Sequence, residues 1–241
     1  MPNSNLKKLD LLQTHFRNQG DAQRAAHNQK FFQTGPGQYG EGDSFLGIPV
    51  PVIRKFAKAH STLGTDQVTL LIQSQMHEER LLGLLILVLQ YARADDLKQQ
   101  EELYQLYLSL FQWINNWDLV DTTCPHIVGK HLLNKVRSPL YTWASSELLW
   151  PRRIAIISTL TFIRQGDLDD TFALAQQMLR DPEVLIHKAV GWMLREAGKR
   201  DLRRLEAFLY THYHSLPRTM LRYAIEKFPS QKRKQLLQGK F

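Results

Sequence analysis

The sequence predicts an all-α fold, an α-solenoid of HEAT-like helix pairs that forms a single curved domain over residues 1–241 with a concave basic face. Apolar residues recur three or four positions apart along most of the chain, which is the periodicity of amphipathic helices. Strand signals are nearly absent, because no Asn-Gly or Asp-Gly turn joins two alternating β-branched runs. A divergent repeat aligns segments 80–83, 153–156 and 188–191. The segments are 73 and 35 residues apart, which is close to two units and one unit of a helix pair of roughly 35–45 residues. This spacing favours a solenoid over a compact bundle.

The predicted helices cover most of the chain. Each has its apolar residues on one face, as at positions 6, 9, 12 and 16. Turn residues such as Gly166-Asp167 and Asp181-Pro182 separate neighbouring segments. In chain order, the predicted helices span residues 6–16, 52–60, 68–75, 79–93, 97–111, 118–136, 153–164, 168–179, 185–199, 202–211 and 219–227.

Residues 34–51 are the exception, because they hold five glycines and three prolines, which no helix tolerates. Pro51 suits the first turn of the helix that follows. The stretch lacks the Gly-Lys-Ser/Thr end of a phosphate-binding loop, and no strand precedes it. We therefore interpret it as a packed connector rather than a nucleotide site.

The composition excludes several classes of protein. The only cysteine, Cys124, rules out a disulfide framework and any multi-cysteine zinc site, and we expect it to be buried. The N-terminal 16 residues place charges inside their apolar stretch, unlike a secretory signal. The most apolar run, residues 81–89, is too short to cross a bilayer, which takes about 20 residues. We expect a cytoplasmic protein.

The charge is unevenly distributed. Residues 1–120 hold 11 Lys and Arg against 12 Asp and Glu, whereas residues 121–241 hold 20 against 11. The entire net charge of +8 therefore lies in the second half of the chain. A polyanion such as nucleic acid fits this half, and so does a basic surface that only keeps the protein soluble.

Two tryptophans, a carboxylate and two cations share a register in the predicted repeat. Trp117, Arg153 and Lys188 fall near the starts of equivalent helices. Asp121 follows Trp117 by four residues and Trp192 follows Lys188 by four, so each pair lies on one helix face. Such a mixture on the concave wall is unlike a hydrophobic core. The alternative is that both tryptophans are core residues and Asp121 caps a neighbouring helix.

Other candidate sites are weaker. His126 and His131 are five residues apart and His212 and His214 are two apart, so neither pair has the spacing of a helical zinc site. Cys124 has no evident catalytic triad. The acidic pairs at 78–79 and 101–102 look like solvated helix faces. We expect no metal site.

Five segments carry a resemblance to a known family. They are residues 42–58, 115–133, 150–158, 187–201 and 217–229, in the correct order. On these segments the sequence resembles the AlkD-like bacterial DNA alkylation repair proteins, which are HEAT-like DNA glycosylases. The likeness runs over nearly the whole chain.

The resemblance implies a function and a set of site residues. Family members excise N3- or N7-alkylated, positively charged purines from duplex DNA without flipping the base, and they leave an abasic site. They use neither a metal nor an organic cofactor, and we expect none here. They act as monomers and hold the duplex in the concave groove. The catalytic carboxylate corresponds to Asp121, and the two lesion-facing tryptophans correspond to Trp117 and Trp192.

The resemblance also suggests how DNA is held. The family's arginine beside the lesion falls on Arg153, with the adjacent Arg152 as a one-residue alternative. Its N-terminal aromatic falls on Phe31, with Phe32 as the competing choice. The loop 34–51 is longer than in the best-known members. Further candidates for phosphate contacts are Lys188, Arg195, Lys199, Arg200 and Arg222.

The chemistry of such a site fits these residue types. A carboxylate near the deoxyribose stabilises the positive charge that develops as the cationic purine leaves. Indole faces attract the same cation. The sequence thus favours a monofunctional alkylpurine DNA glycosylase. Two rivals remain, a DNA-binding protein of the same fold without excision activity and a helical-repeat scaffold for other proteins.

Overall fold

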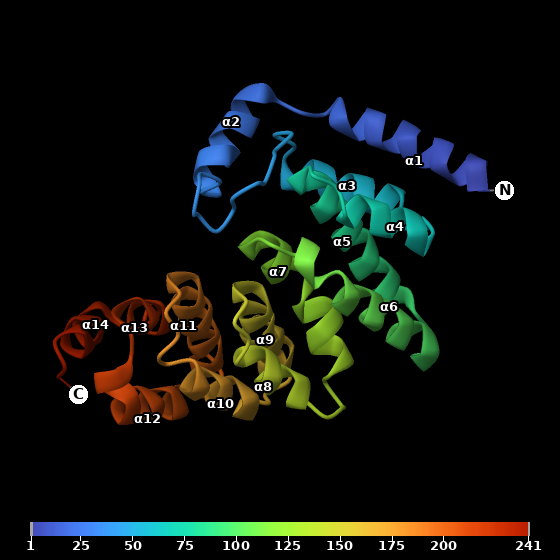
Figure 1. The fold of residues 1–241 in the computed structure, drawn as a ribbon. Coiled ribbons are helices and arrows are strands. Elements are labelled where there is room, and N and C mark those ends of the chain that lie inside the picture. The colour runs from blue at the N-terminus through green and yellow to red at the C-terminus, as the bar shows by residue number, and fades with distance from the viewer. Residues whose placement is uncertain (1, 241) are drawn as a thin grey trace. The chain divides into compact units, whose positions relative to one another are not determined.

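The computed structural model describes residues 2–240, and the regular secondary structure among them is almost entirely helical. Fourteen α-helices lie among them, and the only β contact in this part of the chain is an isolated bridge between Ser44 and Met76. The predicted all-α class is confirmed. The chain divides into an N-terminal unit, Met1–Thr123, and a C-terminal unit, Cys124–Phe241 (Figure 1).

The N-terminal unit is built around one helix, α5. This helix packs against four others, two before it in the chain and two after it. Its apolar residues, such as Leu82 and Ile86, are fully buried, and Gly83 lets α4 approach because a Cβ there would lie 2.7 Å from the Ile72 side chain. The helices of this unit are α1 (Pro2–Arg17), α2 (Ala22–Phe31), α3 (Val50–Ala59), α4 (Thr65–Ile72), α5 (His77–Arg93), α6 (Leu97–Ser109) and α7 (Trp117–Thr123).

The C-terminal unit stacks its helices in two layers. In one layer α11 packs against both α9 and α13, and in the other α8, α10 and α12 cover them (Figure 1). Gly191 permits the close approach of α11 and α13, because a Cβ would lie 2.5 Å from the Met220 carbonyl oxygen. The helices are α8 (Ser138–Ala144), α9 (Leu149–Arg164), α10 (Asp169–Gln177), α11 (Val184–Gly198), α12 (Leu202–His212), α13 (Arg218–Ala224) and α14 (Ser230–Leu237).

Stacked helix pairs are thus present within the C-terminal unit. In this unit α8 packs against α9 and α10 packs against α11, and the two pairs follow one another along the chain. A single curved solenoid over residues 1–241 stays a prediction.

One predicted helix is interrupted. Residues 118–136 were expected to form a single helix, but α7 ends at Thr123 and a π-helical turn, Pro125–Gly129, follows. Proline has no backbone N–H, so Pro125 cannot continue the i to i−4 hydrogen bonds. The Gly129 N–H instead donates to the Cys124 carbonyl at 2.9 Å, which closes the wider turn. Cys124 itself is fully buried, as predicted.

Three helices were not predicted from the apolar periodicity, namely α2, α8 and α14. No residue of α2 is buried, and α14 buries only Leu236. The seven-residue α8 is too short to show a repeat. A helix without a buried stripe leaves no apolar period in the sequence.

The glycine-rich stretch is a packed connector, as predicted. Residues 34–49 form no helix, and the segment buries Asp43 and Ile48, each 3% exposed. No helix within residues 2–240 is both long and apolar enough to cross a membrane.

The acidic pair Glu78 and Glu79 corrects the sequence interpretation. Both were expected on a solvated face, but they are 2% and 0% exposed. Glu78 accepts backbone N–H groups of residues 46–48, at 2.8–3.3 Å. Glu79 forms an ion pair with Arg17 of α1, with 2.7 Å between Nε and Oε1. Both carboxylates hold other segments of the N-terminal unit on the start of α5.

Candidate functional site

The helix α7 presents an indole and a carboxylate on one face. Trp117 is its first residue and Asp121 its fifth, so the two side chains lie one turn apart. Both side chains are partly exposed, whereas Leu119 and Val120 on the other side are buried. The predicted pairing of Trp117 with Asp121 is therefore present within the N-terminal unit.

Both phenylalanines at the end of α2 contact Trp117. The Phe32 ring stacks on the indole, with centroids 5.3 Å apart and an angle of 17° between the planes. The Phe31 ring meets it edge-on at 6.1 Å. Phe32 is 9% exposed but Phe31 is 56% exposed. Phe31 is thus the aromatic side chain that a ligand can reach, and Phe32 supports the indole from inside.

A buried polar network lies beneath these rings, and the sequence interpretation missed it. His77 lies between two carboxylates, with Nδ1 3.1 Å from Asp43 Oδ2 and Nε2 2.8 Å from Asp118 Oδ2. Asp43 also forms an ion pair with Arg80. The side chains of Asn115 and Asn116 donate to Asp43 at 3.2 Å and 3.0 Å.

The network is charged. Burial alone would lower the pKa of His77, but the charges and hydrogen bonds of Asp118 and Asp43 outweigh it and raise that pKa to about 9. Burial would raise the pKa of Asp43, but His77, Arg80 and Asn116 outweigh it and hold that pKa below its ordinary value. At neutral pH His77 is therefore an imidazolium that donates from both ring nitrogens.

Hydrogen bonds at the starts of α5, α9 and α11 show which residues of these helices correspond to one another. Arg152 of α9 donates to the carbonyls of residues 146 and 147, and Arg80 of α5 donates to those of residues 74 and 75. The Nε2 atom of His187 in α11 lies 2.6 Å from the carbonyl oxygen of residue 181, again six positions earlier. Arg80 therefore corresponds to Arg152 and His187, and the predicted alignment of Arg80 with Arg153 is one residue out of register.

The two adjacent arginines have internal partners. Arg152 forms an ion pair with Asp181, with 2.7 Å between Nε and Oδ2, and is 8% exposed. Arg153 is 5% exposed and donates to the Leu185 carbonyl at 2.6 Å. Both arginines tie the start of α9 to the segment that begins α11.

Lys188 and Trp192 share one face of α11, as predicted. Within residues 2–240, Lys188 makes no hydrogen bond or ion pair and is partly exposed. Trp192 lines a cavity of about 500 Å³ between α9 and α11. The other lining residues are Leu160, Ile163, Arg164, Glu196, Lys199 and Arg200.

Arg195 differs from Lys188 in that carboxylates surround it. It forms ion pairs with Glu196 and with Glu226, which follows α13. Burial would raise the pKa of Glu196, but Lys199 and Arg195 outweigh it and hold that pKa below its ordinary value. Much of the charge of Arg195 is thus neutralised within the protein.

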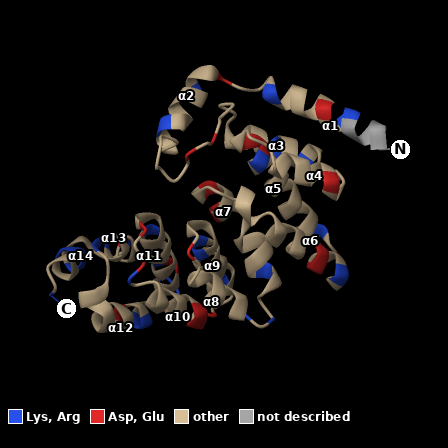
Figure 2. Cartoon of the chain, in the orientation of Figure 1, with Lys and Arg blue, Asp and Glu red and all other residues tan. Residues whose placement is uncertain are grey.

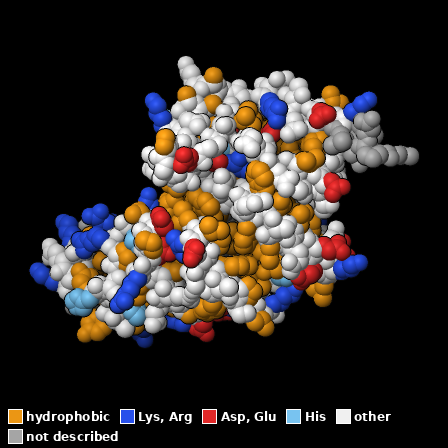
Figure 3. All heavy atoms as spheres, viewed as in Figure 1, with side chains coloured by type: hydrophobic (Ala, Val, Ile, Leu, Met, Phe, Trp, Pro, Cys, Tyr) orange, Lys and Arg blue, Asp and Glu red, His pale blue; other side chains and the backbone are white. Residues whose placement is uncertain are grey.

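The positive charge belongs to the C-terminal unit. Its sequence holds 20 Lys and Arg against 10 Asp and Glu, whereas the N-terminal unit holds 11 against 13. Figure 2 shows many of these cations on α13 and α14, and Figure 3 shows cationic side chains across the surface of the same helices. Within the described residues, no group of three or more His, Cys, Asp or Glu side chains could hold a metal ion.

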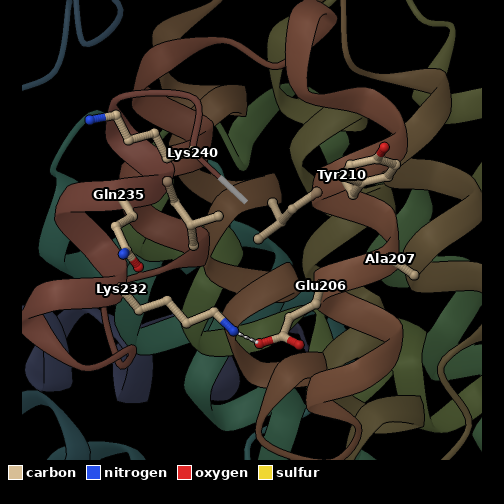
Figure 4. A pocket seen from close by; sticks show the side chains of 8 residues that line it. Glu206, Ala207, Tyr210, Lys232, Gln235 and Lys240 are labelled. Atoms are coloured by element: carbon tan, nitrogen blue, oxygen red, sulfur yellow. Dashed lines mark hydrogen bonds and ion pairs between the residues drawn. The ribbon is translucent and has the colours of Figure 1, made fainter.

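A second cavity, of about 330 Å³, lies between α12 and α14 (Figure 4). Leu209 and Leu236 line it, and an ion pair between Lys232 and Glu206 lies at its edge. It contains neither tryptophan nor Asp121, so it is separate from the predicted site residues.

The predicted residues thus form one group in each unit. Phe31, Trp117 and Asp121 belong to the N-terminal unit. The remaining predicted residues, Arg152, Arg153, Lys188, Trp192 and Arg195, lie on α9 and α11 of the C-terminal unit.

Comparisons with known proteins cover most of the chain. Residues 12–228 match the family model described as DNA alkylation repair enzyme. Among solved structures, the chain is similar to a "Predicted DNA alkylation repair enzyme" from Enterococcus faecalis. That likeness has a TM-score of 0.69 and 18% identity, and it covers 88% of this chain and 98% of that one. It shows a shared fold. No curated protein sequence matches the chain significantly.

Proposed function

Because the chain belongs to the family of DNA alkylation repair enzymes, we propose that it is a monofunctional DNA glycosylase. Its substrates are positively charged N3- and N7-alkylpurines in duplex DNA, and its product is an abasic site. The observation that supports this most directly is the face of α7, where Trp117 and Asp121 lie one turn apart. The exposed ring of Phe31 extends this face.

Asp121 is the proposed catalytic carboxylate. As the bond between C1′ and the purine nitrogen breaks, its electron pair neutralises the purine and positive charge develops on the deoxyribose. The carboxylate stabilises that charge and orients a water molecule. The water oxygen bonds to C1′ and its proton leaves to Asp121 or to solvent. The cationic base is already a good leaving group, so this scheme requires no strong general acid.

Trp117 and Trp192 are proposed to contact the lesion through their indole faces. An aromatic face attracts a cation, and a desolvated contact of this kind contributes about 2 kcal/mol. The stacking of Phe32 on Trp117 holds one indole in a defined orientation. Phe31 is proposed to contact the nucleotide next to the lesion. In this scheme the lesion remains in the DNA stack and is not flipped out.

The C-terminal unit is proposed to grip the DNA backbone as a monomer. Its net charge of +10 suits a polyanion. Lys188 is the clearest candidate for a phosphate contact, because no carboxylate neutralises it within the described residues. Arg153 is proposed to approach the backbone beside the lesion. Arg152 and Arg195 have carboxylate partners in the protein, so we propose smaller contributions from them.

The test is the release of free base from duplex DNA that contains N7-methylguanine. We expect release well above the spontaneous rate, and a loss of about 10²- to 10³-fold in Asp121→Asn with DNA affinity retained. Wild-type protein that is folded and bound to DNA but releases no base would refute the glycosylase proposal. That result would favour a DNA-binding protein without excision activity.

A further inference from the structure

The first turn of α5 is polar and buried, although the apolar core of the N-terminal unit follows it directly. His77, Glu78, Glu79 and Arg80 are 2%, 2%, 0% and 3% exposed. Arg80 and His77 both reach Asp43, and three of the four side chains also connect α5 to other parts of the unit. Glu79 reaches α1, Glu78 reaches the loop at residues 46–48, and His77 reaches α7 through Asp118.

The start of α7 depends on these contacts. A helix of seven residues has little stability of its own, so its position is set by what holds its ends. Asn116 donates to Asp43 and its side-chain oxygen accepts the Trp117 N–H at 2.9 Å. Asp118 accepts from His77 at 2.8 Å. Residues 116–118 are thus joined on both sides to the pair formed by Asp43 and His77.

His77 also lies at the base of the aromatic stack that carries Trp117. Its ring stacks on Phe45, with centroids 4.6 Å apart and an angle of 27° between the planes. Phe45 stacks on Phe32 at 5.0 Å, and Phe32 stacks on Trp117 at 5.3 Å. One imidazole therefore supports the indole through the rings and holds the backbone of α7 through Asp118.

In this network, His77 is the charged group that offsets the negative charge of Asp118. The Oδ1 atom of Asp118 is buried and has no hydrogen-bond partner, so Oδ2 and His77 provide the contact that balances its charge. A buried carboxylate without a charged partner is strongly unfavourable. If the imidazolium were lost, Asp118 would move toward solvent and the start of α7 would move with it.

We propose that His77 is a positioning residue, which fixes the start of α7 between Asp43 and Asp118 and thereby orients Trp117 and Asp121 toward the lesion. This inference rests on the proposed function for its effect on excision. The proposed role does not require His77 to contact DNA. Its direct consequence is structural, namely that α7 is ordered by His77 and not by Glu78 or Glu79.

The matched experiment compares His77→Gln with Glu79→Gln. Both replace a buried polar side chain in the same turn, but the hydrogen bonds of Glu79 go to α1 and to Ser74, and among the described residues none goes to α7. We expect His77→Gln to speed amide hydrogen exchange in residues 117–123 by about tenfold, whereas Glu79→Gln speeds exchange in α1 instead. We also expect a 10- to 100-fold lower single-turnover rate of excision in His77→Gln, with affinity for undamaged duplex nearly unchanged. Glu79→Gln should excise at about the wild-type rate.

A second pair of variants keeps the inference testable if His77→Gln does not fold. Asp118→Asn retains an oxygen that accepts the Nε2–H of His77, and Asp118→Ala does not. We expect Asp118→Asn to keep α7 more protected, and to excise faster, than Asp118→Ala. Equal behaviour of these two variants would contradict the positioning role.

The two proposals can fail separately. The positioning role would be overturned if amide hydrogen exchange in α7 were as slow in His77→Gln as in the wild-type protein. It would also be overturned if exchange became faster to the same extent in α1 and α7. Both outcomes hold whether or not the protein excises bases. An excision rate in His77→Gln that falls no further than in Glu79→Gln would overturn it too. If the wild-type protein releases no base while His77→Gln still loosens α7 selectively, the glycosylase proposal fails and the structural role of His77 stands.

Discussion

The first turns of α5 and α9 share one hydrogen-bonding arrangement, but its connections to the rest of the protein differ. Arg80 and Arg152 are each the fourth residue of their helix, and each donates to carbonyl oxygens five and six positions earlier. Each also pairs with a carboxylate from another segment, Asp43 or Asp181. At α9 the arrangement ends there, since the Asp181 carboxylate otherwise accepts only the Glu183 N–H among the described contacts.

At α5 the same carboxylate is shared. Asp43 accepts hydrogen bonds from His77, Asn115 and Asn116 as well as from Arg80, and His77 passes the connection on to Asp118. A packing contact that occurs in both units is thus extended in one of them to the helix that carries Trp117 and Asp121. The difference shows that in the N-terminal unit the buried polar contacts extend beyond the start of α5 to the start of α7.

Removing the shared carboxylate should have the largest effect. Asp43→Ala leaves Arg80 and His77 buried without their common partner, so we expect a loss of about 3–5 kcal/mol in the free energy of unfolding. Asp181→Ala leaves only Arg152, and we expect about 1–3 kcal/mol. Urea denaturation measures both. Equal losses would show that the extra donors around Asp43 add nothing.

The next largest effect should be a pH dependence of stability that comes from His77 at the start of α5. The pKa of His77 is about 9 in the folded protein, above its ordinary value, because Asp118 and Asp43 outweigh burial. Arg80 forms an ion pair with the same Asp43. The contribution of His77 is therefore full below pH ~6.5 and is lost as the pH rises through ~9, a change of about 3 kcal/mol. Urea unfolding at pH 6 and 9.5 measures this. The difference in stability between wild type and His77→Gln should shrink over that range, and parallel curves for the two proteins would contradict the assignment.

Truncating the supported indole should slow excision without unfolding the protein. For Trp117→Ala we expect a rate about 30-fold lower, which corresponds to the roughly 2 kcal/mol of a desolvated cation–π contact. The single-turnover rate on DNA with N7-methylguanine measures it. Trp143→Ala, in α8, is the matched indole control and should excise at nearly the wild-type rate. Similar losses in both variants would point to general destabilisation instead.

The smallest expected effect belongs to the C-terminal unit. Lys188→Gln should weaken duplex binding by a few fold and reduce the slope of log affinity against log salt by about 1, as for one lost phosphate contact. Titrations at several salt concentrations measure both quantities. Lys98→Gln, at an exposed position of α6, is the control and should leave the slope unchanged. An unchanged slope in Lys188→Gln would remove this residue from the proposed interface.

Much of the fold could be predicted from the sequence, because most of its helices bury an apolar stripe. The errors have physical causes. The helices α2 and α14 bury almost nothing, so they have no apolar period to detect. Pro125 interrupts the predicted helix at residues 118–136, although the apolar periodicity of the sequence continues through this position. The repeat was one residue out of register because Arg152 and Arg153 are adjacent, and only hydrogen bonds show which one corresponds to Arg80.

The face formed by Trp117 and Asp121 could be predicted because it depends only on spacing within one helix. The network around His77 could not, since Asp43 lies 34 residues away in a loop without periodicity. A signal was nevertheless present. Residues 81–87 are apolar all round, which marks a buried helix, and its first turn is therefore buried as well. Four polar residues at that point must have partners inside the protein.

The three backbone N–H groups that converge on Glu78 have a consequence for how this protein can diverge. The connector is anchored at residues 46–48 by an internal anion, and at residue 43 by Asp43, whereas Gly37 and Gly42 upstream have positive φ angles and open space around them. Length changes can therefore be accommodated at Gly37 and Gly42, whereas Gly40 between them is buried and packs against the Phe32 carbonyl oxygen. A longer or shorter segment at these two glycines would leave Phe45, Phe32 and Trp117 stacked on one another.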